Sequence, residues 1–116
     1  MKQFLAIYTG APAAMSLWNE LPEQERRSRQ AAGVVAWKRW AEDNKKSIVA
    51  MGGPLGRTKR IAREGINDVR NNMSAFTIVE AESHEAAARL FVNHPHFIIF
   101  PGDGVELMEC LPIPEM

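Results

Sequence analysis

The sequence predicts an α+β fold of the ferredoxin-like type, with the order βαββαβ, a four-stranded antiparallel sheet and two helices on one face of that sheet. Alternating apolar runs, typical of strands, occur near both ends of the chain and in its middle. One long segment with helical spacing and one shorter alanine-rich segment separate these runs. No internal repeat or low-complexity stretch interrupts the 116 residues, so we expect a single domain over residues 1–116.

The first expected strand covers residues 2–9, KQFLAIYT. Side chains alternate between the two faces of a strand, so Phe4, Ala6 and Tyr8 share one face. Leu5 and Ile7 share the other face, and both faces are therefore apolar. The stretch GAPAAMS after this strand is expected to be a loop.

Residues 22–43 are expected to form the first helix. Glu23 and Glu25 follow Pro22 in its first turn, where the helix dipole favours acidic side chains. An apolar stripe at helical spacing follows, made of Gly33, Val34, Trp37, Trp40 and Ala41. A glycine inside a helix costs up to about 1 kcal/mol relative to alanine. We therefore expect Gly33 to mark a close approach of the helix to the sheet.

The middle of the chain is expected to contain a strand over residues 47–53 and a polar strand over residues 56–65, paired antiparallel through the GGPLG turn. Residues 66–73, INDVRNNM, are expected to form a loop. Residues 74–82, SAFTIVEAE, are a further strand. Its faces carry Phe76 and Ile78 on one side and Thr77, Val79 and Ala81 on the other.

The C-terminal part is expected to contain a helix, a turn and the last strand. Ser83 should cap a helix over residues 83–94, with Glu85 in its first turn, and the pair His94-Pro95 should end it. The apolar run FIIF then connects to a PGDG turn, and residues 104–113 form the closing strand. Cys110 alternates with large apolar residues in this strand, so we expect a buried, unreactive thiol.

The composition argues against a nucleic-acid or membrane partner. Basic and acidic residues balance at 14 each, so no net field attracts a polyanion. The one basic cluster, GRTKRIAR, is interpreted as a solvated edge strand. The single cysteine excludes an internal disulfide, and no apolar run is long enough to span a bilayer. We therefore expect a cytoplasmic protein.

The two apolar faces of the sheet predict a homodimer. Two helices can cover only one face, and the other would leave an apolar patch larger than monomers usually expose. A second copy, packed on the open sheet face with two-fold symmetry, would bury that patch. Alternatively, the loops TGAPAAMS and GINDVRNNM fold over the open face and leave a monomer.

Four segments resemble the YCII-related (YciI-like, DGPF-type) domain family: MKQFLAIY, MGGPLG, VEAESHEAAARLFVNHPHF and VELMECLPIP. The resemblance covers nearly the whole chain and implies a ferredoxin-like domain that dimerises as a dimeric α/β barrel. It also implies acid–base chemistry by an aspartate after the first strand and a histidine on the first helix. The matching stretches here, TGAPAAM and AAGVVAWKRW, contain neither residue, and GINDVRNNM stands in place of the DGPF stretch.

Three functions are compatible with the sequence, and whether the protein is an enzyme stays open among them. The first is small-molecule binding in a cleft between helix and sheet, for an aromatic or acidic metabolite, with Tyr8, Trp37, Gly53, Leu55 and His94 as ligand-binding residues. The second is hydrolase- or lyase-like acid–base catalysis by His94 or His96. The third is a structural or protein-interaction subunit.

The second hypothesis requires a carboxylate near a histidine, and Asp103 or Glu106 could supply it. Structural explanations compete for every candidate: a helical stripe explains the tryptophans, and turn chemistry explains Asp103. The two histidines are separated only by a proline, which is not the usual spacing of metal ligands. No phosphate-binding loop is present either, so we expect neither a metal nor a cofactor.

Overall fold

The chain has the predicted fold class. The computed structural model describes residues 1–114 and contains a four-stranded antiparallel sheet with the strand order β2-β5-β1-β6. These strands are β1 (Lys2–Thr9), β2 (Ile48–Pro54), β5 (Met73–Ala81) and β6 (Gly104–Glu109). The first and last strands of the chain are neighbours, and β5 lies on the other side of β1, which is the ferredoxin-like topology.

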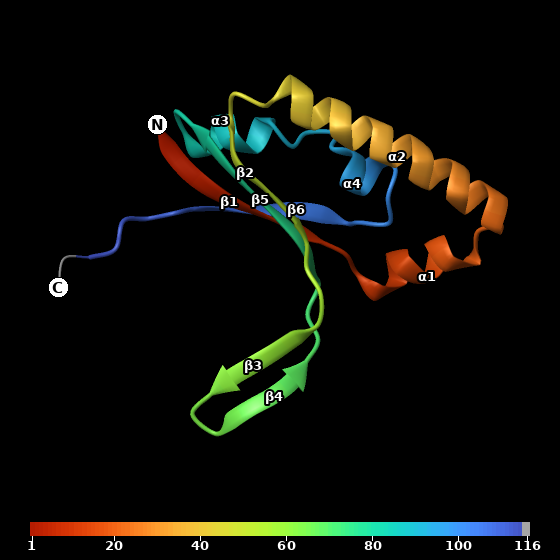
Figure 1. Cartoon of the computed structure of the whole chain (residues 1–116), viewed down its shortest axis with the longest axis horizontal. Helices are drawn as coiled ribbons and strands as arrows, with labels where there is room; N and C mark the ends of the chain where they lie inside the picture. The colour runs from red at the N-terminus through yellow and green to blue at the C-terminus, as the bar shows by residue number, and fades with distance from the viewer. Residues whose placement is uncertain (115–116) are drawn as a thin grey trace.

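Helices cover one face of this sheet (Figure 1). They are α1 (Pro12–Glu20), α2 (Glu23–Asp43), α3 (His84–Arg89) and α4 (Pro95–Ile98). In Figure 1, α2, α3 and α4 lie above the sheet, and α1 lies beyond one end of it. No helix within residues 1–114 combines the length and the apolar composition that crossing a membrane requires.

The core lies between the sheet and the helices, on the face of β1 that carries Phe4, Ala6 and Tyr8. Phe4, Ala6 and Tyr8 are fully buried on β1, and Val79 is fully buried beside them on β5. Trp40 of α2 and the segment after α3 close the core from above, with the Trp40 and Phe91 rings 5.2 Å apart. Their burial supplies most of the hydrophobic stabilisation of the chain, at about 25 cal/mol per Å² of apolar area.

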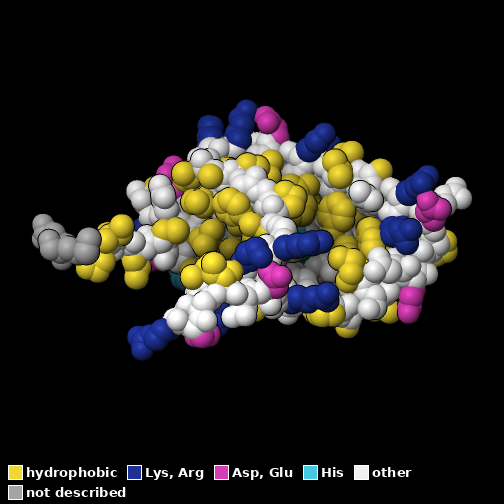
Figure 2. Space-filling model, turned by 60° about the horizontal axis from the view of Figure 1, so that its bottom comes forward, with side chains coloured by type: hydrophobic (Ala, Val, Ile, Leu, Met, Phe, Trp, Pro, Cys, Tyr) yellow, Lys and Arg dark blue, Asp and Glu magenta, His cyan; other side chains and the backbone are white. Residues whose placement is uncertain are grey.

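The opposite face of the sheet is open. Leu5, Ile7 and Ile78 point to it and are only half-buried, and Met108 of β6 is 44% exposed there. Figure 2 brings the lower side of Figure 1 forward. On this side hydrophobic side chains spread across the middle of the molecule, and Lys and Arg side chains stand in front of them.

The polar strand pairs differently from the prediction. β3 (Thr58–Ala62) pairs with β4 (Gly65–Val69), in the segment that was expected to be a loop, and not with β2. These two strands form a hairpin that projects from the sheet (Figure 1). The physical reason is local: the two-residue turn Arg63-Glu64 closes a hairpin at once, whereas Pro54 ends β2 and lacks the N–H needed for further pairing.

Two helical predictions also need correction. The expected loop GAPAAMS begins α1, because Pro12 occupies its first turn and alanines follow. The expected helix over residues 83–94 begins as predicted, with the Ser83 hydroxyl accepting from Ala86 N–H at 3.1 Å, but α3 ends at Arg89. Asn93 then takes a left-handed conformation (φ 59°), and the chain restarts as α4.

Two residue-level predictions are wrong. Cys110 is exposed, because β6 ends at Glu109 and the chain leaves the sheet there. Gly33 is buried, but it does not lie against the sheet: a Cβ at that position would stand 2.5 Å from the Phe100 ring. The glycine therefore makes room for an aromatic side chain from the segment after α4.

Candidate functional site

An apolar cavity of about 400 Å³ lies between α2 and the sheet. Helix α2 contributes Val34, Trp37 and Lys38, and Phe100 closes one side. The sheet contributes segments 51–54 of β2 and 75–77 of β5, with Tyr8 of β1. Its volume falls in the range of ligand pockets, and Lys38 is the only charged residue in the lining.

The floor of this cavity is a chain of satisfied polar groups. The Thr77 hydroxyl donates to the Met51 carbonyl at 2.9 Å, so Tyr8 donates its own hydroxyl proton to Thr77 Oγ1 at 3.0 Å. Burial raises the pKa of Tyr8 to about 12, partly offset by this hydrogen bond, so the phenol stays neutral at physiological pH. Tyr8 and Thr77 belong to the lining, and both are fully buried.

Three of the five predicted ligand-binding residues meet at this cavity, and two do not. Tyr8, Trp37 and Gly53 line it. Leu55 lies outside the lining, after the end of β2, and is 41% exposed. His94 is fully buried behind the wall, with its ring 4.6 Å from that of Trp37.

His94 sits inside an aromatic cluster. Its ring lies 4.6 Å from Trp40, 5.1 Å from Tyr8 and 5.9 Å from Phe91, between ring centres. Its Nδ1 accepts from the backbone N–H of His96 at 3.0 Å and so caps α4. Nδ1 therefore carries no proton, and Nε2, buried and without a polar partner among residues 1–114, carries the hydrogen.

Burial, together with a smaller effect of the neighbouring His96, lowers the pKa of His94 to about 4. The imidazole is therefore neutral at pH 7. Its fixed tautomer, its full burial and its capping bond describe a structural side chain with no route to a ligand in the apolar cavity.

His96 lies at a second cavity of about 460 Å³, formed where the loops after β1, β4 and α4 meet. Its Nε2 is 2.7 Å from the carbonyl oxygen of Thr9, which can only accept, so Nε2 carries the hydrogen and Nδ1 is a free base. Burial lowers the pKa of His96, although the bond to Thr9 and the charge of Asp103 act in the opposite direction. Gly102 packs so closely on this ring that a Cβ there would overlap Nε2.

Neither carboxylate pairs with a histidine in the described part of the chain. Asp103 instead accepts a hydrogen bond from the Thr9 hydroxyl. Glu106 is exposed on the open sheet face, opposite Ile7. Residues 1–114 contain no group of three side chains placed to hold a metal ion.

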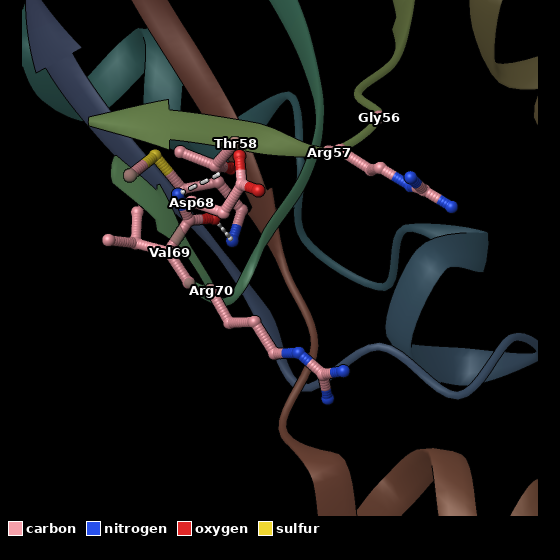
Figure 3. Close-up of a pocket in the computed structure, with 8 residues that line it drawn as sticks. Gly56, Arg57, Thr58, Asp68, Val69 and Arg70 are labelled. Atoms are coloured by element: carbon pink, nitrogen blue, oxygen red, sulfur yellow. Dashed lines mark hydrogen bonds between the residues drawn. The ribbon is translucent and has the colours of Figure 1, made fainter. Parts of the chain in front are cut away.

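A third hollow, of about 550 Å³, flanks the base of the hairpin (Figure 3). Its lining consists of Gly56, Arg57, Thr58, Asp68, Val69, Arg70, Asn71 and Met73. All of these except Thr58 are exposed, and Figure 3 shows Arg57 and Arg70 extending away from the strands. A hollow built from exposed side chains is not pre-organised for a small ligand.

Sequence reasoning missed Phe100 and Thr77 as site residues. Phe100 lines both the apolar cavity and the cavity beside His96, so it separates the two. Phe100 belongs to the run FIIF, which was interpreted as a connecting segment before the last turn. The only sequence signal for it is its position shortly after the His94-Pro95 pair. Thr77 had a signal: it is a hydroxyl on the buried face of an otherwise apolar strand, and such a group needs a partner.

Comparison with known proteins supports the fold. No family model matches the sequence, and no curated protein matches it. Among solved structures, the chain resembles the 5-chloro-2-hydroxyhydroquinone dehydrochlorinase (TftG) from Burkholderia phenoliruptrix AC1100, in its complex with 2,5-dihydroxybenzoquinone. The TM-score is 0.51 at 22% identity, over 90% of this chain and 89% of the other. Similarity at this level of identity shows a shared fold and nothing about the reaction.

Proposed function

We propose that this protein is a homodimeric member of the YCII-related family that binds a small, largely apolar ring compound in the cavity between α2 and the sheet. The observation that carries the proposal is the cavity itself, a half-open hollow of about 400 Å³ between Trp37, Phe100 and the edge of the sheet. The floor hydroxyls already bond to each other, so recognition depends on shape and apolar contact. Lys38, at the wall, suits one anionic substituent on such a ring.

The dimer part of the proposal rests on surface area. The chain exposes 8616 Å², whereas a compact monomer of 13.0 kDa exposes about 6,300 Å². The excess of about 2,300 Å² is comparable to what one subunit of an obligate dimer buries, about 1,000–2,500 Å². The radius of gyration, 16.2 Å, likewise exceeds the value of about 13 Å expected for a compact chain of this length.

Ala75 and Gly56 allow a matched test of the cavity. Ala75 is in the lining and pairs with the buried Tyr8, so its side chain lies on the helix side of the sheet. Gly56 is outside the lining, a Cβ there would meet no atom within 4 Å, and its φ is not positive. We would screen substituted phenols, benzoates and naphthalenes by thermal shift with the wild-type protein, where a ligand at 100 times its Kd adds about 2.7 kcal/mol to the free energy of unfolding.

Ala75→Leu should then abolish the shift that a hit compound produces, because the larger side chain fills the cavity, and Gly56→Leu should keep it. If the two variants respond to the hit compound alike, the cavity assignment is wrong.

A second candidate function is acid–base catalysis by His96. The observation that favours it is a neutral imidazole with a fixed tautomer at a cavity wall, with Nδ1 free to take a proton. We propose His96 in preference to His94, which is buried away from both cavities. His96→Gln should then abolish turnover of any compound that the wild type converts, whereas the thermal shift from a compound bound in the separate apolar cavity should be retained. Unchanged turnover in His96→Gln would exclude this mechanism.

A further inference from the structure

We propose that the β3–β4 hairpin is an arm that lies against a second copy of this chain and covers part of the open sheet face formed there by β1, β5 and β6. The inference rests on the homodimer proposed above. It adds to that proposal that the β3–β4 hairpin of one subunit contacts the open sheet face of the other.

The hairpin needs a partner for its own stability. An isolated two-stranded hairpin is marginally stable in water, and this one makes no extensive contact with any other element of residues 1–114. Ile61 and Ile66 lie directly opposite each other on one face of the ribbon and are 74% and 67% exposed. A pair of exposed isoleucines on an unsupported ribbon is typical of a surface that another molecule covers.

The open sheet face needs a cover, and the hairpin of the same chain does not provide it. Leu5, Ile7, Ile78 and Met108 remain partly exposed on that face. In Figure 1 the hairpin projects from the sheet on the side opposite α2 and stands clear of the strands. It is therefore placed to reach a molecule that sits on the open face, and a second copy presents the same apolar surface to it.

The charges of the two surfaces are complementary. Segment 57–70 contains five basic and two acidic residues, and only Lys59 among the basic ones forms an ion pair within residues 1–114, with Asp68 at 2.8 Å. The open face of β1, β5 and β6 carries Glu80 and Glu106 and no basic residue. Opposite charges at the rim of an apolar contact favour this pairing over other orientations.

The area agrees with this arrangement. The excess surface of about 2,300 Å² per chain lies in the range that one subunit of an obligate dimer buries, about 1,000–2,500 Å². The projecting hairpin contributes to this surface (Figure 1).

Cross-linking tests the placement directly. In the full-length chain with Cys110→Ser, the double variant Ile61→Cys and Met108→Cys would be treated with a short bismaleimide at micromolar concentration. We expect a covalent dimer on a denaturing gel, with mass spectrometry identifying a linked peptide pair from residues 61 and 108. Ile98→Cys with Met108→Cys is the matched control, because Ile98 is 60% exposed on α4, above the sheet.

The outcomes separate the arm from the dimer. One outcome is a protein that sediments as a dimer while the link between positions 61 and 108 is no more abundant than the link between positions 98 and 108. That result would contradict the proposed position of the hairpin but not the dimer. A link within a single chain shows that the hairpin folds back on its own sheet, and it also overturns the arm. Sedimentation as a monomer removes both the dimer and the arm.

Introducing a charge at position 61 tests which surface the hairpin contacts. Because that surface is acidic, Ile61→Asp should raise the dimer Kd at least tenfold, and Ile61→Lys should raise it less. Val35→Asp, at a site on α2 that is 65% exposed, should leave the dimer Kd within about twofold of the wild type. An equal or reversed order for Asp and Lys at position 61 contradicts the assignment of the acidic sheet face.

Discussion

His94 is a neutral imidazole that acts as a structural residue. One ring nitrogen caps α4, and the other lies among aromatic rings without a polar partner in the described chain. Protonation would place a charge in this apolar cluster, which is costly without a counter-ion. The core of the C-terminal half is therefore sensitive to pH through a side chain that, in our interpretation, takes no part in binding.

We predict that acid destabilises the protein through His94. Its pKa is about 4 in the folded chain and about 6.5 in the unfolded chain, so the unfolded chain binds the proton first as the pH falls. The stabilisation that neutral His94 gives the folded chain is complete above about pH 7 and declines below about pH 6.5. At pH 4 the free energy of unfolding is therefore lower by roughly 3 kcal/mol. Urea unfolding at several pH values and one chain concentration measures it.

His94→Asn is the matched variant, because the asparagine amide oxygen can still accept from the N–H of His96 and does not titrate. Its unfolding free energy should depend less on pH than that of the wild type. Equal pH dependence in the two proteins would show that His94 is not the responsible group.

Among the elements, α2 is held to the core through few residues. Most of its surface is exposed, and only Gly33 and Trp40 are buried. Trp40 supplies both an apolar ring and a polar contact, because its Nε1–H donates to the Leu90 carbonyl at 2.7 Å. This bond ties α2 to the end of α3 and so positions the wall of the apolar cavity.

Trp40→Phe should lower the free energy of unfolding by about 1–3 kcal/mol, because it leaves the Leu90 carbonyl without this donor in a partly buried place. Trp18→Phe is the control. Trp18 lies on α1, which has no buried residue, and its ring centre is 6.1 Å from that of Phe100. Guanidinium unfolding of both variants measures the difference, and an equal loss in the two would refute a special role for Trp40.

At the scale of the whole molecule, the chain is thin and extended. Its dimensions are 55 × 42 × 18 Å, and both the hairpin and the C-terminal segment project from the body (Figure 1). Leu111 and Ile113 on that segment are 72% and 84% exposed. A chain with so much apolar surface in water is expected to associate, because burial of that surface is its main source of further stabilisation.

The proposed homodimer predicts that stability depends on chain concentration. We expect sedimentation at twice 13.0 kDa at micromolar concentration, and a Tm that rises with chain concentration because association draws the equilibrium toward folded chains. Scanning calorimetry over a hundredfold range of concentration measures this. A folded species of 13.0 kDa with a constant Tm over that range would contradict the dimer.

The sequence by itself determined the local features. Alternation grouped Phe4, Ala6 and Tyr8 on one face of β1, and a hydroxyl before an acidic turn identified Ser83 as a helix cap. The long helix was expected over residues 22–43, and α2 spans Glu23–Asp43. These features depend on neighbours a few residues apart, where the periods of helix and strand apply. Of the five residues predicted to bind a ligand, Tyr8, Trp37 and Gly53 line one cavity, and their binding role stays a prediction.

Tertiary structure alone decided the rest. The contact of His96 with Thr9 joins residues 87 positions apart, and that of Tyr8 with Thr77 joins residues 69 positions apart. No periodicity reports which side chains meet at such distances, so the separate environments of His94 and His96 could not be predicted. The pairing of β3 with β4 was also undetermined, because a polar strand matches either neighbour in pattern and only the competition between turns selects one.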